Sequence, residues 1–294
     1  MFPGQGSQKV EMGKWLCKTY PQARSLFEEA SDTLGKDLYR LCVEGPASEL
    51  DLTENAQPAI LTVSVAAHAI YSLQFGKLPD FVLGHSLGEY SALVVAGVLR
   101  FRDAVKAVSL RGRWMQEAVP PGEGSMVAVM GLPEMEVREI CLAVNSGRIV
   151  VVANVNGENQ MVLSGHRDAV EEVASQVQGR GARTRSLPVS APFHSPLMRP
   201  AETQLRKHLE DLRWGSAQVR WVSNVDAQVY QEPQLIREKL IEQVCAPVRF
   251  KDCVGVVAKA GVEQFVELGA GRVLSGLVRR IVSGAQIEQF GDGE

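Results

Sequence analysis

The chain has few cysteines and no close cysteine pair, which argues against two kinds of stabilised scaffold. Its five cysteines are scattered through the sequence and form no CxxC motif; they are Cys17, Cys42, Cys141, Cys245 and Cys253. An odd and scattered set predicts neither a disulfide framework nor a zinc site. We therefore expect reduced thiols, as in a cytoplasmic protein, and no bound metal.

The sequence also has little net charge, no long apolar run and no basic leader. The formal net charge is −3 at pH 7, which gives no global field to attract nucleic acid. The most apolar stretches, such as 59–70 and 92–99, are too short or too interrupted to span a bilayer. No basic region followed by an apolar core opens the chain, so no signal peptide is predicted. We expect a monomer with no nucleic-acid or membrane partner.

The composition is that of a globular α/β protein. The chain has 294 residues, of which 45% are hydrophobic and 22% charged, and this length suits one large α/β domain that carries an insertion. Strand-like apolar runs alternate with helical patterns, as in the strand expected at 80–83 and the helix expected at 87–98. The alternation predicts a hydrolase-like core with a mainly parallel sheet and helices on both faces.

A different pattern fills the middle of the chain. The expected elements are a strand over 125–130, a helix over 134–144, strands over 149–154 and 160–164, a helix over 167–178 and a strand over 183–188. The order βαββαβ is that of a ferredoxin-like module. We expect a small ferredoxin-like subdomain over 123–190, inserted into a discontinuous catalytic subdomain built from 1–122 and 191–294.

Residues 81–90 are the most informative part of the chain. An apolar run leads into Gly84-His85-Ser86-Leu87-Gly88, and a helical pattern follows at once. Gly-x-Ser-x-Gly between a strand and a helix is the form of a nucleophile elbow, which exposes a serine oxygen on a sharp turn. Ser86 would lie at a helix N-terminus, whose free N–H groups favour an oxyanion. This arrangement indicates acyl transfer through a covalent acyl-serine.

A serine nucleophile needs a base, and the chain offers five histidines. Four of them suit structural, solvated or outward-pointing positions: His68, His85, His166 and His208. The fifth, His194, lies in a Pro- and Ser-rich turn between elements, where a functional side chain can be displayed on a fixed scaffold. Spacing alone leaves a structural loop histidine equally open at this position.

Two further segments have an unusual composition. Pro3-Gly4-Gln5-Gly6-Ser7-Gln8 is a glycine-rich polar turn, suited to presenting backbone N–H groups to an anion, although a tight surface turn explains the same pattern. Arg111 lies among apolar residues on a helix expected over 102–118. Its planar guanidinium is a natural two-point receptor for a carboxylate. A structural pairing with a core acid is the alternative.

Together these motifs resemble the malonyl-CoA:acyl carrier protein transacylase family, and the resemblance runs through most of the chain. Seven segments match in the family's order: Phe2-Pro3-Gly4-Gln5-Gly6-Ser7-Gln8, Gln57-Pro58-Ala59, Gly84-His85-Ser86-Leu87-Gly88-Glu89, Arg111-Gly112-Arg113-Trp114-Met115-Gln116, Ala191-Pro192-Phe193-His194-Ser195-Pro196-Leu197-Met198, Ser223-Asn224-Val225 and Glu267-Leu268-Gly269-Ala270-Gly271. One difference is that the family usually has several apolar residues before the first of these segments. Here the chain starts at Met1, so the first strand would be shortened or the start trimmed.

The resemblance implies a two-step exchange that serves fatty acid or polyketide synthesis. Ser86, activated by His194, would attack the thioester of malonyl-CoA and release CoA. The phosphopantetheine thiol of acyl carrier protein would then take the malonyl group. The resemblance assigns the orientation of the histidine to the main-chain carbonyl of Gln243, and the oxyanion hole to the backbone N–H groups of Gln5 and Leu87. It implies no permanently bound cofactor.

The resemblance also implies which residues surround the substrate. Arg111 would hold the malonyl carboxylate, and Gln57, Met115, Phe193 and Asn156 would border the acyl group. Phe193 resembles the malonyl-selecting form of the family, in which a bulky ring crowds a 2-methyl branch. Such a difference in size is worth about 1–3 kcal/mol. Because acyl carrier protein is acidic, we expect a basic docking patch, for which the candidates are Arg180, Arg183, Arg185, Arg272, Arg279 and Arg280.

Three rival functions make different demands on these residues. A serine esterase or thioesterase of the α/β-hydrolase type predicts a triad acid between serine and histidine and does not require Arg111. An acyl hydrolase on the transacylase scaffold would be expected to lose that arginine. A non-catalytic scaffold that binds carrier protein would not need Ser86 and His194.

Overall fold

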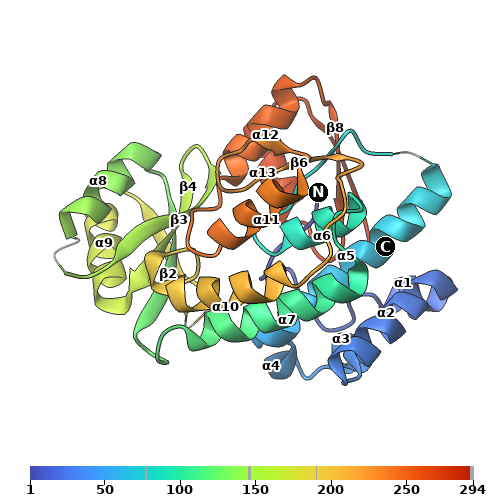
Figure 1. Cartoon of the computed structure of the whole chain (residues 1–294). Coiled ribbons are helices and arrows are strands. Elements are labelled where there is room, and N and C mark those ends of the chain that lie inside the picture. Colours follow the sequence, from blue (N-terminus) through green and yellow to red (C-terminus); the bar gives the residue numbers. More distant parts are fainter. Residues whose placement is uncertain (77, 145–146, 190, 292–294) are drawn as a thin grey trace.

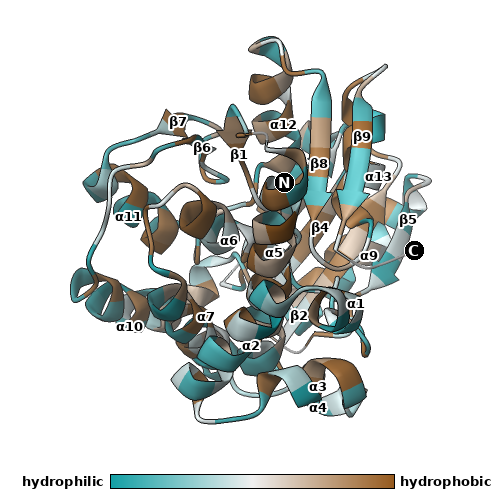
Figure 2. Ribbon diagram, turned by 90° about the vertical axis from the view of Figure 1, so that its right-hand side faces the viewer, coloured by the Kyte–Doolittle hydropathy of each residue, from teal (hydrophilic) through white to brown (hydrophobic). Residues whose placement is uncertain are grey.

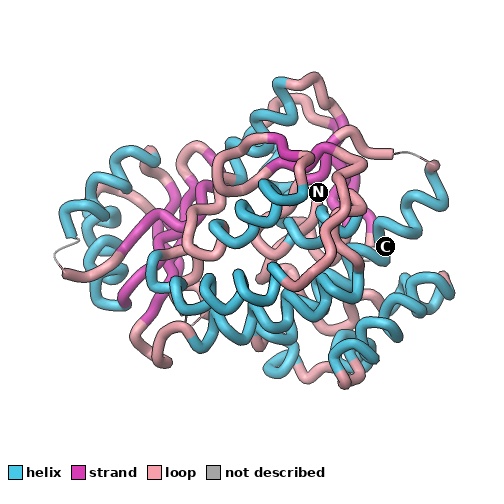
Figure 3. The backbone as a smooth tube through the Cα atoms, in the orientation of Figure 1, coloured by secondary structure: helices cyan, strands magenta, loops and turns pink. Residues whose placement is uncertain are grey.

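The structure, a computed structural model, describes residues 1–76, 78–144, 147–189 and 191–291. Helices surround two small sheets in the larger part of the molecule, and a four-stranded sheet with two helices lies at one end, on the left in Figure 1. The strands in Figure 3 accordingly fall into two groups. The molecule is therefore α/β, with mixed sheets and helices.

Helix α5 (Thr53–Phe75) lies at the centre of the larger part and ends at Gly76, which has a φ of 61°. The apolar pattern of the sequence predicts this helix over 57–75. The predicted start is four residues too late, since the helix begins at Thr53 and continues through Pro58. Pro58 has no N–H to offer the carbonyl of Glu54. The hydroxyl of Ser109 donates to that oxygen instead, at 3.2 Å, and the helix continues.

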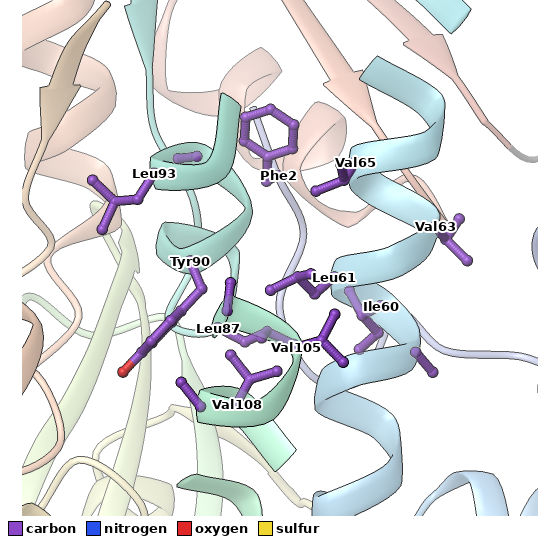
Figure 4. Packing of buried hydrophobic residues seen from close by; sticks show 14 of the residues in the cluster. Phe2, Ile60, Leu61, Val63, Val65, Leu87, Tyr90, Leu93, Val105 and Val108 are labelled. Atoms are coloured by element: carbon purple, nitrogen blue, oxygen red, sulfur yellow. The ribbon is translucent and has the colours of Figure 1, made fainter. Parts of the chain in front are cut away.

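The helix that follows Ser86 packs between α5 and a second long helix. Figure 4 shows Leu87 and Tyr90, at the start of α6 (Gly88–Val95), next to Val105 and Val108 of α7 (Phe101–Glu117). Leu61 of α5 faces the same apolar cluster. A fully buried apolar side chain contributes about 1.5–3 kcal/mol, so this cluster fixes the helix on which the serine turn depends.

The larger part holds two small sheets, a three-stranded one with a parallel and an antiparallel pair and a two-stranded parallel one. Strand β1 (Phe81–Val82) pairs parallel with β6 (Arg220–Val222), which pairs antiparallel with β7 (Val229–Tyr230). Strand β8 (Gln264–Leu268) pairs parallel with β9 (Gln286–Phe290), as Figure 2 shows. The first two residues join these groups, since Phe2 N donates to Leu83 O at 3.0 Å and Leu268 N donates to Met1 O at 2.9 Å.

The smaller part is a four-stranded antiparallel sheet in the order β3-β4-β2-β5. Its elements follow the chain as β2 (Gly124–Met130), α8 (Glu134–Val144), β3 (Val150–Gly157), β4 (Gln160–His166), α9 (Arg167–Gly179) and β5 (Arg183–Ser186). The two helices bury an apolar cluster of their own against the sheet, which includes Val152, Leu163 and Val173. The predicted boundary at Ser190 and the last three residues of the chain lie outside the described residues.

The remaining helices cover the larger part. They are α10 (Arg199–Glu210), α11 (Pro233–Glu242), α12 (Phe250–Lys259), α13 (Val273–Ile281), the short 3-10 helix Pro196–Met198, and the N-terminal helices α1 (Lys14–Thr19), α2 (Pro21–Leu34), α3 (Leu38–Glu44) and α4 (Ala47–Leu50). The sequence pattern did not predict the 3-10 helix or α1 to α4. Among the described residues, α5 is the one helix long and apolar enough to cross a membrane. Because 67% of its apolar window is buried, it serves as a core helix.

Candidate active site

The turn at Ser86 is held tight by two glycines. Ser86 has a φ of 52°, a left-handed conformation that a serine rarely adopts. A Cβ on Gly84 would lie 1.9 Å from the carbonyl carbon of Gly88, and a Cβ on Gly88 would lie 2.1 Å from Phe2 O. Only glycine fits either position, so the sequence motif reflects a close approach of three backbone segments. The Ser86 side chain is left partly exposed at the start of α6.

The His194 ring is hydrogen-bonded to the serine. Its Nε2 lies 2.7 Å from Ser86 Oγ, and its Nδ1 lies 2.8 Å from the main-chain oxygen of Gln243. A carbonyl only accepts hydrogen bonds, so Nδ1 carries the proton and Nε2 is free to accept from the serine hydroxyl. The geometry therefore places a general base on the nucleophile, oriented by a peptide carbonyl.

The environment keeps this histidine neutral. Burial and, second, the nearby positive charge of Arg111 lower the pKa of His194 to about 3. At physiological pH the imidazole is therefore neutral, and it can accept a proton from Ser86 without first losing one. The hydrogen bond to Gln243 O opposes the decrease in pKa.

Arg111 lies beside the same serine oxygen. It is 1% exposed and donates to Gln57 Oε1 at 2.8 Å, to Gln243 Oε1 at 2.9 Å and to Ser86 Oγ at 3.1 Å. Burial lowers its pKa, while Tyr90 and Glu89 raise it. The hydrogen-bond acceptors around the guanidinium are two neutral amide oxygens and a hydroxyl, so these bonds hold it in place without cancelling its charge. An acyl group on Ser86 that ended in a carboxylate would meet this charge.

The two expected oxyanion donors lie on segments that contact the turn. Leu87 directly precedes α6 and is buried. Gln5 follows Gly4, on which a Cβ would lie 2.4 Å from His85 O, so this loop is pressed against the serine turn. The side chain of Gln5 donates to Thr53 Oγ1 at 3.2 Å, which ties the loop to the start of α5.

The other predicted substrate-binding residues occupy different positions. Gln57 touches Arg111, as described. Phe193 is buried next to His194, and Met115 lies one turn beyond Arg111 on α7, buried in the main apolar cluster. Asn156 lies on β3 of the smaller part, and its Oδ1 is 2.9 Å from Nε2 of His85. It therefore contacts the turn from behind, through the residue before the serine.

Three roles at the site were missed from the sequence. Asn224 Oδ1 accepts from Ser86 N and its Nδ2 donates to Gly84 O, both at 2.8 Å. The side-chain Nε2 of Gln243, a residue expected to act through its carbonyl alone, donates to Ser86 O at 2.9 Å. Glu89 is fully buried and accepts hydrogen bonds from both Asn224 and Gln243. Burial raises the pKa of Glu89 to about 8, and these hydrogen bonds and Arg111 oppose the increase.

The described residues contain no group of three or more His, Cys, Asp or Glu side chains placed to hold a metal ion. The donor set at the site consists instead of a hydroxyl, a neutral imidazole, a guanidinium and amides. Such a set suits acyl transfer through the serine and recognition of an anionic acyl group.

Comparison with known proteins places the whole chain in one family. The family model described as an acyl transferase domain matches residues 1–288. The malonyl CoA-acyl carrier protein transacylase of Bacillus subtilis is 46% identical over 284 residues, which cover 96% of this chain and 89% of that protein. An acyl carrier protein S-malonyltransferase structure from Vibrio cholerae has a TM-score of 0.97 and 42% identity, covering 99% of this chain and 96% of that one. A malonyl-transacylase in complex with a type II PKS acyl-carrier protein has the same TM-score and identity, covering 99% and 95%. The chain belongs to the malonyl CoA-acyl carrier protein transacylase family.

Proposed function

We propose that the chain transfers a malonyl group from malonyl-CoA to the phosphopantetheine thiol of acyl carrier protein through a malonyl ester of Ser86. The observation that carries this proposal is the position of Arg111, whose guanidinium lies 3.1 Å from Ser86 Oγ and is held by two amide oxygens. A malonyl ester on Ser86 brings its free carboxylate to this cation. A guanidinium binds a carboxylate through two parallel hydrogen bonds.

The first half-reaction uses His194 as base and then as acid. The Ser86 hydroxyl gives its proton to His194 Nε2 while Oγ attacks the thioester carbon. The backbone N–H groups of Gln5 and Leu87 stabilise the oxyanion, a contribution of about 3 kcal/mol per donor. The carbon–sulfur bond then breaks, and the CoA sulfur takes the proton from His194.

The second half-reaction runs the same steps with the other thiol. The carrier-protein thiol gives its proton to His194 Nε2, and its sulfur attacks the malonyl ester of Ser86. The ester bond breaks, and the serine oxygen takes the proton back from His194. No permanently bound cofactor is needed, because both thiols are substrates and the charge changes are met by protein groups.

The geometry favours transfer over a simple esterase. An esterase of the α/β-hydrolase type orients its histidine with a carboxylate, whereas His194 Nδ1 meets the carbonyl of Gln243. The buried cation at Ser86 has no role in hydrolysis of an uncharged acyl group. A malonyl carboxylate paired with Arg111 fixes the ester and leaves little room for an activated water.

We further infer that residues 123–190 form a ferredoxin-like subdomain inserted into the catalytic part, 1–122 and 191–294. The strand order β3-β4-β2-β5 and the helices α8 and α9 support this. The His85–Asn156 contact joins the two parts behind Ser86.

Phe193 and Met115 then border the acyl group, and exposed arginines on both parts meet the acidic carrier. The free cysteines suit a cytoplasmic enzyme.

The test is incubation with malonyl-CoA and purified acyl carrier protein, with the intact masses of both proteins measured over time. We expect a malonylated enzyme first and a malonylated carrier after it is added. Rapid release of malonate with no loaded carrier would contradict transfer and favour a hydrolase. No modification of either protein would favour the non-catalytic scaffold.

A further inference from the structure

Glu89 is a buried acid at the site to which the reaction steps above give no role. It lies in the first turn of α6, three residues after Ser86, and its side chain has no solvent exposure. One carboxyl oxygen accepts from Asn224 N at 2.7 Å, and the other accepts from Gln243 Nε2. Both oxygens of a buried carboxyl group are thus directed at N–H donors that come from distant parts of the chain.

The two residues that donate to Glu89 also form hydrogen bonds with the backbone of Ser86. Asn224 accepts from Ser86 N at 2.8 Å, and Gln243 donates to Ser86 O at 2.9 Å. Ser86 needs such support because its φ is 52°. Glu89 therefore lies behind the residues that hold both peptide groups of the nucleophile.

Two acceptors decide which end of the Gln243 amide faces Arg111, namely the Glu89 carboxyl group and the main-chain oxygen of Ser86. An amide has an accepting oxygen and a donating nitrogen, and only its surroundings determine which way it points. Both accept from Nε2, so Oε1 is left on the opposite side, 2.9 Å from Arg111. With the amide reversed, two donors would face each other at Arg111.

We propose that Glu89 is a positioning residue for recognition of the acyl carboxylate. It fixes the orientation of the Gln243 amide, and through it the position of Arg111 beside Ser86. This inference rests on the proposed function, because it assigns Glu89 to the selection of a malonyl over an uncharged acyl group.

The substitution Glu89→Gln tests this role with almost no change in shape. A glutamine at 89 must place its NH₂ against one of two donors, Asn224 N or Gln243 Nε2. The backbone N–H of Asn224 cannot reverse, but the Gln243 amide can. An arrangement that keeps the Asn224 bond therefore turns Gln243 Nε2 away from Ser86 O and toward Arg111, which displaces the guanidinium.

We expect Glu89→Gln to reduce kcat/KM for malonyl-CoA relative to acetyl-CoA by about 10-fold or more, the usual effect of losing a charge-assisted hydrogen bond. Both rates are measured as carrier loading under identical conditions, at a pH above 8, where a carboxyl group with a pKa of about 8 is mostly ionised. Glu267→Gln is the matched control, since Glu267 is equally buried and accepts from Leu274 N and Ser275 N at 3.1 and 2.7 Å, away from the site. We expect this control to leave the malonyl-to-acetyl ratio unchanged.

A second variant separates positioning from loss of structure. Gln243→Met removes the amide but keeps the main-chain carbonyl that orients His194, and we expect the same fall in the ratio. Because Glu89 acts through Gln243, adding Glu89→Gln to Gln243→Met should change the ratio by less than about 2-fold. An unchanged ratio in Glu89→Gln, or full additivity in the double variant, would overturn the inference. Absence of malonyl transfer in the unaltered protein would instead overturn the proposed function.

Discussion

Ser86 and His194 share both a hydrogen bond and an unusual backbone conformation. Ser86 Oγ lies 2.7 Å from His194 Nε2, and the two residues have φ values of 52° and 57°. Such left-handed conformations cost non-glycine residues about 1–3 kcal/mol each. Hydrogen bonds offset this free energy. Asn224 and Gln243 bind the backbone of Ser86, and the carbonyl of Gln243 accepts from the His194 ring. The catalytic pair is therefore positioned by the fold before substrate arrives.

Removing Ser86 should abolish the first half-reaction, whereas removing His194 should only slow it. We expect Ser86→Ala to form no acyl-enzyme, because the hydroxyl that is hydrogen-bonded to His194 Nε2 is lost. His194→Ala keeps the nucleophile but loses the base, so acylation should slow by about 100- to 10,000-fold. Intact mass after incubation with malonyl-CoA measures both. A normal acyl-enzyme in Ser86→Ala would show that another residue carries the group.

Arg111→Ala should separate malonyl from acetyl transfer. Loss of one partner from a buried ion pair costs about 3 kcal/mol or more, on the order of 100-fold, and acetyl-CoA has no carboxylate to lose. We therefore expect kcat/KM to fall by this amount for malonyl-CoA and far less for acetyl-CoA. Arg113→Ala is the matched control, because Arg113 is on the same helix and exposed. Equal losses for both substrates would contradict the carboxylate-binding role of Arg111.

The reactive residues of this site could be predicted from the sequence, whereas their supports could not. Ser86 lies in a Gly-x-Ser-x-Gly motif, and Arg111 is a charged residue among apolar ones. Both can therefore be selected as functional candidates from the sequence alone. Asn224 and Glu89 are ordinary polar residues inside matching segments. Their roles arise from burial and from contacts between positions more than 130 residues apart, which no local pattern records. The one available signal was a charged residue in the first turn of an otherwise apolar helix.

The fold shows the same division between local and distant causes. The elements of the smaller part were predicted within a few residues, because their strands and helices have strong apolar periodicity. The helix α2 was missed, although Ala23, Phe27 and Ala30 follow helical spacing on its buried face. The start of α5 was misplaced because the Ser109 hydroxyl that compensates Pro58 comes from another helix. The short strand β7 depends on its pairing with β6 and has little pattern of its own.

Gly88→Ala should destabilise the protein through the backbone approach behind the nucleophile. The new Cβ would lie 2.1 Å from Phe2 O, and backbone atoms cannot move aside as a flexible side chain can. We expect a loss of about 3 kcal/mol in the free energy of unfolding, measured by denaturant titration. Gly276→Ala is the control, because nothing lies within 4 Å of its Cβ position on α13. Alanine should stabilise that helix by about 0.5–1 kcal/mol. Equal stability of the two variants would contradict the close approach.

The pH dependence of acetyl transfer should report the influence of Arg111 on His194. Burial, followed by the charge of Arg111, lowers the pKa of His194 to about 3, so the base stays neutral and active as the pH falls from 8 toward 4. Removal of the charge in Arg111→Ala takes away the second of these causes and must raise the pKa. Because protonation inactivates the base, the acidic decrease in kcat/KM, which reports the free enzyme, should then begin at a higher pH than in the unaltered protein. Acetyl-CoA is the substrate for both proteins, since it does not depend on the lost carboxylate contact. A decrease at the same pH in both would show that Arg111 does not act on His194 electrostatically, and a shift to lower pH would reverse the proposed sign.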